Sequence, residues 1–553
     1  MNVFYPRLKS MLPPRTAAAR GSCVADPKVL RDWLDHLPLA NRGFALLRVH
    51  DALREFNATA MAPQPRLAML DMFETTAHAL VDDVKNEVRE FFPMSAERID
   101  DAQLAAEIEC ELAIGYTEVV CDLCSPSGRA PFLRRGVVAK SLTRACLHQS
   151  ARLWQAFRTH TEPGEGVWQG LHDLFRFAVK SGCADKANEA SQGGAKTTAR
   201  SIYIQAVLHA FAKPNQFTQT QNRQLHSSLP VLASWCTMKP GYAPTGAIAV
   251  CATGDLSPPA PPRTGQIDPA DRWVLDIHLL LARFDALLVG KDSGAEIVLP
   301  ARRGGGRATL AVDVVEVLCR VWSERTARES QRNTEATLLE TEVGLSGLHF
   351  ILSGSQEFES ALPLAGETQQ PAASWAQRTP GREPAKRARA EVVDRSRRGY
   401  RLRWSSGEEA RARVGELIAF APLVHGERQW HYGALRWLRA DARAGVEAGV
   451  ELLPSGPIAV AVYALDMSGI PRVPVRGILV NSSEADAKSG AGILVPRPFA
   501  RDAVALEVLR TDEAATEAMA RPVRVARFSV QDDGLYQKIV LPDEALERIR
   551  AIA

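Results

Sequence analysis

The hydrophobic pattern of this chain changes its period part of the way along. Up to about Met238, apolar residues recur three and four positions apart, as in the Ile202–Ala212 segment, which is the spacing of one face of an α-helix. After Trp322 the pattern is mainly one of alternation, as in Tyr400–Trp404, which is typical of β-strands. One hydrophobic core cannot hold 553 residues, so the two patterns belong to separate domains. The sequence predicts a multidomain α+β protein.

Composition changes along the chain divide it further. Proline- and glycine-rich stretches and one segment of low hydrophobicity mark the boundaries. Helical patterns cover Val274–Leu288 and Leu310–Trp322, whereas in residues 336–354 apolar and polar residues alternate as they do in strands. The predicted segments are a flexible arm (1–25), an all-α helical bundle (26–240), a mixed α/β connector (241–323), a β-rich module with a flexible insertion at about 356–389 (324–456), and a further β-rich C-terminal domain with a terminal helix (457–553).

Net charge and apolar runs exclude several classes of protein. Lys and Arg number 67 and Asp and Glu 64, so a binding site for a polyanion has to be local. The most apolar run, Leu275–Val289, is interrupted by charged residues, and the first residues lack the apolar centre of a signal peptide, so we expect no membrane insertion. Nine cysteines in a chain of this length suggest reduced thiols. We therefore expect a cytoplasmic protein.

Motifs for catalysis are incomplete. Gly193–Thr198 is similar to the end of a phosphate-binding loop but lacks its first glycine and a preceding strand. Cys121 and Cys124 form a CxxC without a second pair, which favours two ordinary buried side chains over half of a zinc site. No nucleophile elbow or paired-histidine motif is found. We predict that the chain is not an enzyme and needs no metal or cofactor.

Two motifs in the β-rich module carry recognisable chemistry. Arg328 and Arg332 form an RxxxR just before a strand, and Asp394, Ser396 and Gly399 form a DxSxxG directly before Tyr400–Trp404. Guanidinium groups pair with phosphates and with the Hoogsteen edge of guanine, and they also stack on its ring. A carboxylate accepts hydrogen bonds from guanine N–H groups, and a glycine permits backbone geometry that other residues resist. The set suits a dianionic ligand with two purines.

The order of these motifs resembles the PilZ domain, a small β-barrel through which many bacterial proteins bind cyclic di-GMP. The resemblance implies that Arg328 and Arg332 wrap the ligand, with Arg325 and Arg398 as possible additional contacts. It also implies that Asp394 and Ser396 read a guanine edge and a phosphate, and that Gly399 allows the tight turn between the strands. Gly449 matches the glycine of the family's closing strand.

The arginine assignment has an alternative. Arg378 and Arg382 form a rival RxxxR inside the expected insertion, and the gap from Arg332 to Asp394 is longer than is usual in the family. Residues 378–403 are also strongly basic, with Glu383, Glu391 and Asp394 as the only acids. This stretch is the local positive region that the balanced total charge requires.

The helical region, with its LDHLPLAN opening, resembles that of large proteobacterial proteins that carry a PilZ domain. The function predicted from these resemblances is a non-enzymatic cyclic di-GMP receptor that signals to an unidentified protein partner through the helical region. The alternative is a scaffold or chaperone-like interaction protein with a barrel that no longer binds nucleotide. An RNA-binding barrel is disfavoured because exposed aromatic pairs are lacking, so we expect no nucleic-acid partner. The sequence leaves open whether the C-terminal β region forms a second barrel.

Overall fold

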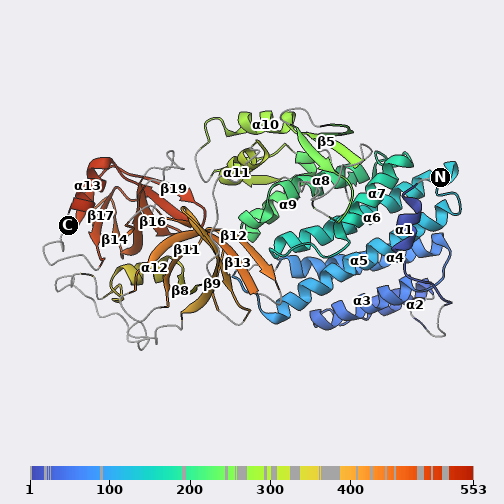
Figure 1. Cartoon of the computed structure of the whole chain (residues 1–553), viewed down its shortest axis with the longest axis horizontal. Coiled ribbons are helices and arrows are strands. Elements are labelled where there is room, and N and C mark those ends of the chain that lie inside the picture. The colour runs from blue at the N-terminus through green and yellow to red at the C-terminus, as the bar shows by residue number, and fades with distance from the viewer. Residues whose placement is uncertain are drawn as a thin grey trace. The chain divides into compact units, whose positions relative to one another are not determined.

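The computed structural model divides into two compact units (Figure 1). The helical unit comprises residues 1–90, 94–291 and 296–326, and the β unit comprises 91–93, 292–295 and 327–553. A helical N-terminal region, a closed six-stranded barrel and a further β-rich region follow one another, which confirms the predicted fold class. The structure describes residues 3–17, 22, 24, 26–86, 91–189, 195–242, 247–255, 257, 271–291, 295–300, 308–323, 337–359, 362, 387–406, 409–423, 428–441, 445–453, 456–481, 491–499, 502–512 and 522–551.

Long helices make up most of the helical unit, and α3, α4, α5 and α6 run alongside one another in Figure 1. Within the described residues, no helix has both the length and the apolar character needed to cross a membrane. The helices are α1 (Tyr5–Ser10), α2 (Pro27–Asp35), α3 (Arg42–Asn57), α4 (Pro63–Asn86), α5 (Ala96–Cys124), η1 (Phe132–Arg134), α6 (Arg135–Arg158), α7 (Val167–Lys180), α8 (Ala199–Phe211), η2 (Pro214–Gln216), α9 (Gln219–Ala233), α10 (His278–Leu288) and α11 (Val312–Ser323).

Several helices begin where the sequence supplies a capping side chain. The Asp26 carboxylate accepts hydrogen bonds from the first N–H groups of α2. Thr218 and Gln221 form a reciprocal capping box at the start of α9. Such caps satisfy backbone donors that have no partner within the helix, and each typically contributes about 1 kcal/mol.

A buried network of charged side chains joins α4, α5 and α6. The Arg144 guanidinium on α6 pairs with Glu74 and, at 3.0 Å, with Asp71 on α4. The Tyr116 hydroxyl on α5 donates to Glu74 at 3.0 Å. His148 on α6 stacks against the Tyr116 ring and lies 2.7 Å from the carboxylate of Glu109 and 3.4 Å from that of Glu74. Each buried charge is thus compensated by another, which is the condition for placing charges inside a helix bundle.

Two parts of this unit differ from the sequence expectation. The predicted arm over residues 1–25 contains helix α1, whose Tyr5 and Leu8 are buried, and the Tyr5 hydroxyl donates to the Cys121 carbonyl at 3.1 Å. The helix expected from Val274 begins only at His278, because Arg272–Asp276 forms strand β5. A short apolar run is compatible with both periods, so neighbouring strands decide the outcome.

The short strands of the helical unit form small antiparallel sheets. Strand β5 (Arg272–Asp276) lies between the other two members of a three-stranded sheet. The remaining strands are β3 (Thr237–Pro240) and β4 (Ile248–Cys251) in that sheet, the pair β1 (Asn188–Glu189) and β2 (Lys196–Thr197), and the pair β6 (Glu296–Val298) and β7 (Thr309–Ala311).

The barrel closes in the strand order β10-β13-β12-β11-β8-β9, with antiparallel neighbours throughout. Its interior holds the fully buried Trp404, whose indole N–H donates to the Thr341 hydroxyl at 3.0 Å. Strand β9 begins at Ala388, within the last residues of the segment expected as an insertion. The strands are β8 (Leu338–Val343), β9 (Ala388–Ser396), β10 (Gly399–Trp404), β11 (Leu417–Pro422), β12 (His431–Asp441) and β13 (Gly445–Leu452).

Helix α12 (Leu345–Leu352) follows the first barrel strand, so the strand expected over residues 336–354 is half strand and half helix. Leu345 and Leu348 of this helix pack in one cluster with Leu417 on the barrel and Ile478 on the C-terminal sheet. The alternation that suggested a strand throughout was in fact the apolar face of a short helix between two sheets.

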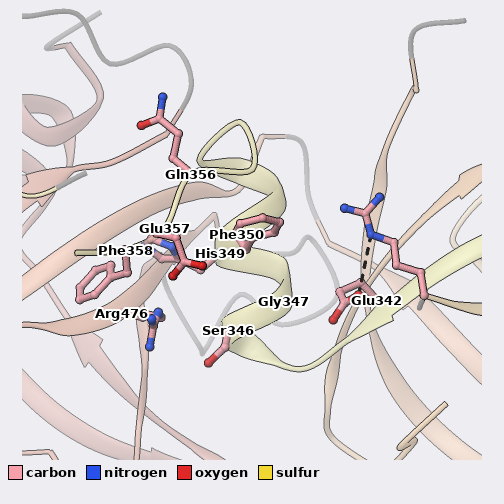
Figure 2. Close-up of a pocket in the computed structure, with 10 residues that line it drawn as sticks. Glu342, Ser346, Gly347, His349, Phe350, Gln356, Glu357, Phe358 and Arg476 are labelled. Carbon is pink, nitrogen blue, oxygen red and sulfur yellow. Dashed lines mark ion pairs between the residues drawn. The ribbon is translucent and has the colours of Figure 1, made fainter. Parts of the chain in front are cut away.

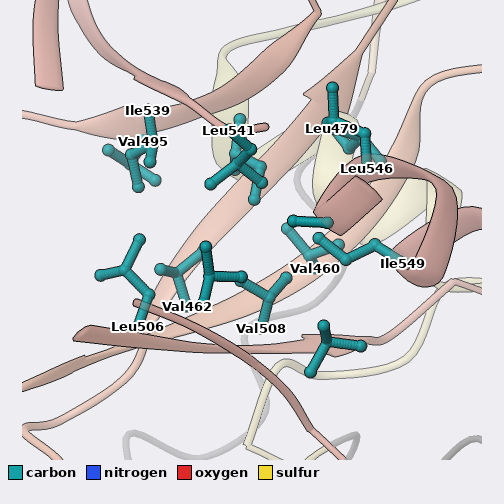
Figure 3. Packing of buried hydrophobic residues seen from close by; sticks show 14 of the residues in the cluster. Val460, Val462, Leu479, Val495, Leu506, Val508, Ile539, Leu541, Leu546 and Ile549 are labelled. Atoms are coloured by element: carbon teal, nitrogen blue, oxygen red, sulfur yellow. The ribbon is translucent and has the colours of Figure 1, made fainter. Parts of the chain in front are cut away.

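The C-terminal region is a seven-stranded antiparallel sheet in the order β18-β17-β14-β15-β16-β20-β19, capped by α13. Val460, Val508 and Ile539 on the strands and Leu546 and Ile549 on α13 belong to one buried cluster (Figure 3). The predicted terminal helix is therefore present and packs on the sheet. The elements are β14 (Ile458–Leu465), β15 (Val475–Val480), β16 (Gly492–Pro496), β17 (Ala505–Arg510), β18 (Val523–Val525), β19 (Ser529–Asp533), β20 (Tyr536–Val540) and α13 (Asp543–Ala551).

The buried histidine of the helical unit makes stability depend on pH. Burial by itself would lower the pKa of His148, but Glu109 and Glu74 outweigh burial and raise it to about 9. Because this value lies above the ordinary pKa of about 6.5, the contribution of His148 is complete below about pH 6.5 and is lost as pH rises through about 9. Between these limits wild type should lose up to about 3 kcal/mol more stability than His148→Gln, measured by urea unfolding of the helical signal. If the stabilities of wild type and His148→Gln changed equally with pH, His148 would not be the source of the pH dependence.

Candidate functional site

A β-bulge sets the direction of the motif side chains at the end of β9. Arg401 pairs with Asp394 and Leu402 with Val392, so Val393 is an extra residue in the ladder. Before the bulge, Val392 points into the barrel with Leu402; after it, Asp394 lies on the outside with Arg401. A bulge reverses which face successive side chains occupy. Without it, the carboxylate of Asp394 would point into the apolar interior.

A second bulge, at Arg436, turns a side chain of β12 to the outside of the barrel in the same way. Leu435 pairs with Val450 inside the barrel, whereas the next pair, Trp437 and Gly449, lies outside. Directly opposed residues share a face, so side chains line up in rows across β9, β10, β13 and β12. We call this surface the arginine face; its two rows are Asp394–Arg401–Gly449–Trp437 and Glu391–Arg403–Glu447–Arg439.

Glu447 is the electrostatic centre of the arginine face. Its carboxylate accepts hydrogen bonds from Arg401 at 2.5 Å, from Arg403 at 2.6 Å and from Arg439 at 2.6 Å. Burial by itself would raise the pKa of Glu447, but hydrogen bonds from Arg401 and Arg403 and the charge of Arg439 outweigh it and hold the pKa at about 2. The carboxylate is therefore ionised at every ordinary pH and fixes three guanidinium groups on one surface.

Gly399 and Gly449 are required by close packing. A Cβ atom on Gly399 would overlap the Val450 carbonyl oxygen on the neighbouring strand. On Gly449 it would overlap the Trp437 indole, which lies over this glycine. The backbone of Gly399 does not have a positive φ, so the turn conformation expected from the sequence is not what demands glycine there. The bare backbone at Gly449 allows an aromatic ring to lie close to the sheet beside Arg401, whose Cζ is 6.0 Å from the ring centroid.

The structure brings together only part of the predicted site. Asp394 is buried, with its carboxylate 3.7 Å from Arg401, and the Ser396 hydroxyl donates to the Gly399 carbonyl at 3.3 Å. Arg398 is exposed in the turn between β9 and β10. Arg325, Arg328 and Arg332 lie outside the described residues, as does the rival pair Arg378 and Arg382.

Sequence reasoning missed several residues of the arginine face. Arg401 and Arg403 were noticed only as part of a basic stretch, while Trp437, Arg439 and Glu447 were not singled out. They belong to strands that are distant in sequence from the DxSxxG, and their register depends on the two bulges. The available signal was the period-2 placement of Arg401 and Arg403 in Tyr400–Trp404 and of the acid Glu447 in the closing strand.

A separate pocket of about 270 Å³ lies beside α12 and contains no residue of the arginine face (Figure 2). Phe358 and Arg476 lie on one side of the helix and Glu342 on the other. Burial raises the pKa of Glu342, and Arg387, at 3.9 Å, partly opposes this rise. The Arg476 guanidinium lies over the Phe358 ring and 3.6 Å from Glu359. Glu342, Arg387 and Arg476 in this pocket thus each lie near a group of opposite charge.

The CxxC cysteines lie in the helical unit, buried on α5. Burial raises the pKa of both Cys121 and Cys124 to about 12, so the metal-binding and nucleophilic thiolate form is strongly disfavoured. Among the described residues, no group of three or more histidine, cysteine or acidic side chains is placed to hold a metal ion.

A closed antiparallel barrel with a DxSxxG on its outer face defines the class of PilZ domains. Family comparison agrees: residues 28–242 match the model of the N-terminal domain of the cyclic-di-GMP receptor FimW. Residues 272–390 and 367–457 match the model of the middle PilZ domain of that receptor. The chain belongs to the PilZ-domain proteins with a large helical N-terminal region.

The chain is also similar to the cyclic-di-GMP receptor FimW of Pseudomonas aeruginosa, to which it is 23% identical over 555 aligned positions. The alignment covers 89% of this chain and 88% of that protein. This coverage is larger than either unit alone, so the likeness extends into both the helical unit and the β unit.

The close packing at Gly399 gives a testable expectation. Gly399→Ala should cost roughly 1–3 kcal/mol of unfolding free energy because the strands β10 and β13 have to separate locally. Hydrogen exchange should speed up in both strands. Gly164→Ala is the matched control, since its nearest neighbour atom would be 3.9 Å from the new Cβ. If the two variants were equally stable, the close approach of β10 and β13 at Gly399 would not require glycine.

Proposed function

We propose that this protein is a non-enzymatic receptor for cyclic di-GMP and that the arginine face of the barrel is part of its binding site. The observation that carries the proposal is the row formed by Asp394, Arg401 and Trp437 across neighbouring strands, in which Gly449 leaves room for the Trp437 indole. The family match to a cyclic-di-GMP receptor supports the choice of ligand.

The chemistry of this row suits a guanine nucleotide. The Asp394 carboxylate can accept hydrogen bonds from guanine N1–H and N2–H. The Arg401 guanidinium suits guanine O6 and N7 or a phosphate. The indole of Trp437 offers a flat surface on which a purine can stack, an interaction worth about 1–3 kcal/mol per base in other proteins. The three groups therefore supply edge recognition and stacking at one place.

The arginine face does not supply enough positive charge to neutralise two phosphates. Its three arginines, Arg401, Arg403 and Arg439, are matched by the three acids Glu391, Asp394 and Glu447, so the face is close to neutral. A ligand with two phosphates needs further cations. In our proposal Arg328 and Arg332 provide them, with Arg325 and Arg398 as additional contacts, while Ser396 binds a phosphate oxygen.

The proposal continues from ligand to output. Binding would bring the arginines before β8 into contact with the dinucleotide and pass this change to a protein partner through the helical region. A cytoplasmic location fits the cysteines, since none of the eight described ones forms a disulfide. No chemical step on the ligand is needed for such a role.

The arginine pairs can be distinguished by calorimetry with cyclic di-GMP. Arg328→Ala with Arg332→Ala should weaken binding at least a hundredfold, because each charged hydrogen bond contributes roughly 1.5–3 kcal/mol. The matched control is Arg378→Ala with Arg382→Ala, which removes the same charge from the rival motif and should leave affinity within about threefold. If only the Arg378 and Arg382 variant lost affinity, the phosphate contacts would belong to that pair instead.

The stacking surface can be tested separately. Trp437→Ala should lower affinity for cyclic di-GMP about tenfold or more, whereas Trp437→Phe, which retains a ring, should lose much less. Asp394→Asn should weaken guanosine dinucleotide binding while leaving the melting temperature of the free protein nearly unchanged. If Trp437→Ala and Trp437→Phe bind equally well, stacking on this residue is not part of recognition.

The scaffold alternative is supported by the pairing of all three arginines of the face with Glu447. A barrel whose charges are internally compensated can serve as a rigid part of an interaction protein. A titration of cyclic di-GMP separates the two functions: a melting temperature that rises with ligand concentration supports the receptor. A flat response at large excess supports the scaffold.

A further inference from the structure

The connection between α5 and α6 presents two neighbouring apolar side chains to solvent. Phe132 is 87% exposed and Leu133 94% exposed, both on the short helix η1. Isolated exposed apolar residues are common, but two adjacent, fully projecting ones of this size form a local apolar tip. We call residues 129–135 the basic-apolar tip.

The backbone of this tip is well anchored. The Gly128 N–H donates to the Cys124 carbonyl at 2.8 Å, and the Arg134 N–H donates to that of Pro131 at 3.1 Å. Gly128 has a positive φ of 66° and packs directly against the Tyr5 side chain. Such a preformed connection loses little conformational entropy when it binds, so the exposed side chains can contribute to binding almost in full.

Cations flank the two apolar side chains along the chain, and one more comes from another connection. Residues 125–136 contain Arg129, Arg134 and Arg135 and no acid, and Lys186 approaches from another connection, its Nζ 3.4 Å from the Cβ position of Gly136. The Arg135 side chain donates to the Ser181 carbonyl at 3.1 Å. None of these four cations forms an ion pair with another residue of the described ranges. Their charge is therefore available to an external partner.

We propose that the basic-apolar tip binds peripherally to an anionic lipid bilayer, with Phe132 and Leu133 entering the headgroup region and the four cations facing lipid phosphates. Charge complementarity favours an anionic surface. A fluid bilayer accepts two projecting side chains without a shaped socket, whereas a protein partner would need a matching cavity. Apolar insertion together with a basic cluster supplies the two signals that stable peripheral binding requires.

This binding is distinct from a membrane-spanning segment and does not depend on the barrel. It would place the helical unit at a membrane surface whether or not the arginine face is occupied. The proposal therefore goes beyond the receptor function and can fail or succeed independently of it.

The test is co-sedimentation of the full chain with vesicles of phosphatidylcholine alone and of phosphatidylcholine mixed with phosphatidylglycerol. We expect binding only to the mixed vesicles and weaker binding at high salt. Phe132→Ser with Leu133→Ser should reduce the partition coefficient at least tenfold. Arg129→Gln with Arg134→Gln should reduce it roughly fivefold per charge.

A matched control removes exposed apolar surface elsewhere. Met467 and Val473 are 88% and 87% exposed in the β14–β15 connection, so Met467→Ser with Val473→Ser should leave vesicle binding unchanged. No sedimentation with mixed vesicles, or an equal loss in this control, would overturn the proposal. So would retained binding in the Phe132 and Leu133 variant. A Phe132→Cys cross-link to one acidic protein, with vesicle binding absent, would assign the tip to a protein partner instead.

Discussion

The carboxylate of Glu447 holds the outer face of the barrel together. Three guanidinium groups from two different strands converge on it, and none of them could lie so close to the others without a negative charge between them. The arrangement fixes long side chains that would otherwise sample many rotamers, so the surface is organised before any ligand arrives. Because the face is nearly neutral, it provides shape and hydrogen-bonding groups more than net charge.

The strand register determines which side chains can take part. Two bulges, at Val393 and Arg436, move Asp394 and Trp437 onto the same surface as Arg401. The glycines at 399 and 449 then allow a neighbouring backbone and an indole ring to approach more closely than a Cβ atom would permit. Bulges and glycines are thus the structural basis of the arginine face, and both are local departures from a regular ladder.

The helical unit uses a different solution for its charges. Arg144, His148, Glu74 and Glu109 are buried between helices and Asp71 is half-buried beside them, and each charge is compensated. Such a network ties α4, α5 and α6 to one relative position, since removing one member leaves a buried charge unpaired. The basic-apolar tip at the start of α6 is the opposite case, because its arginines form no ion pair within the described part of the chain. A rigid bundle with one uncompensated end is well suited to present that end to a partner.

Much of the architecture was predictable from the sequence. The change of hydrophobic period gave the helical region and the strands that follow it, and Asp394, Ser396 and Gly399 were found by their spacing. Short apolar segments were harder to predict, because a short run fits both the helical and the strand period and its packing partners decide between them. Residues 336–354 contain strand β8 and helix α12, and Arg272–Asp276 is a strand. The local sequence determined the period of each segment and the motif residues at one hairpin. Only the tertiary structure decided that Glu447, Arg439 and Trp437 join them, because cross-strand register and bulges bring together residues that are some 40 to 50 positions apart.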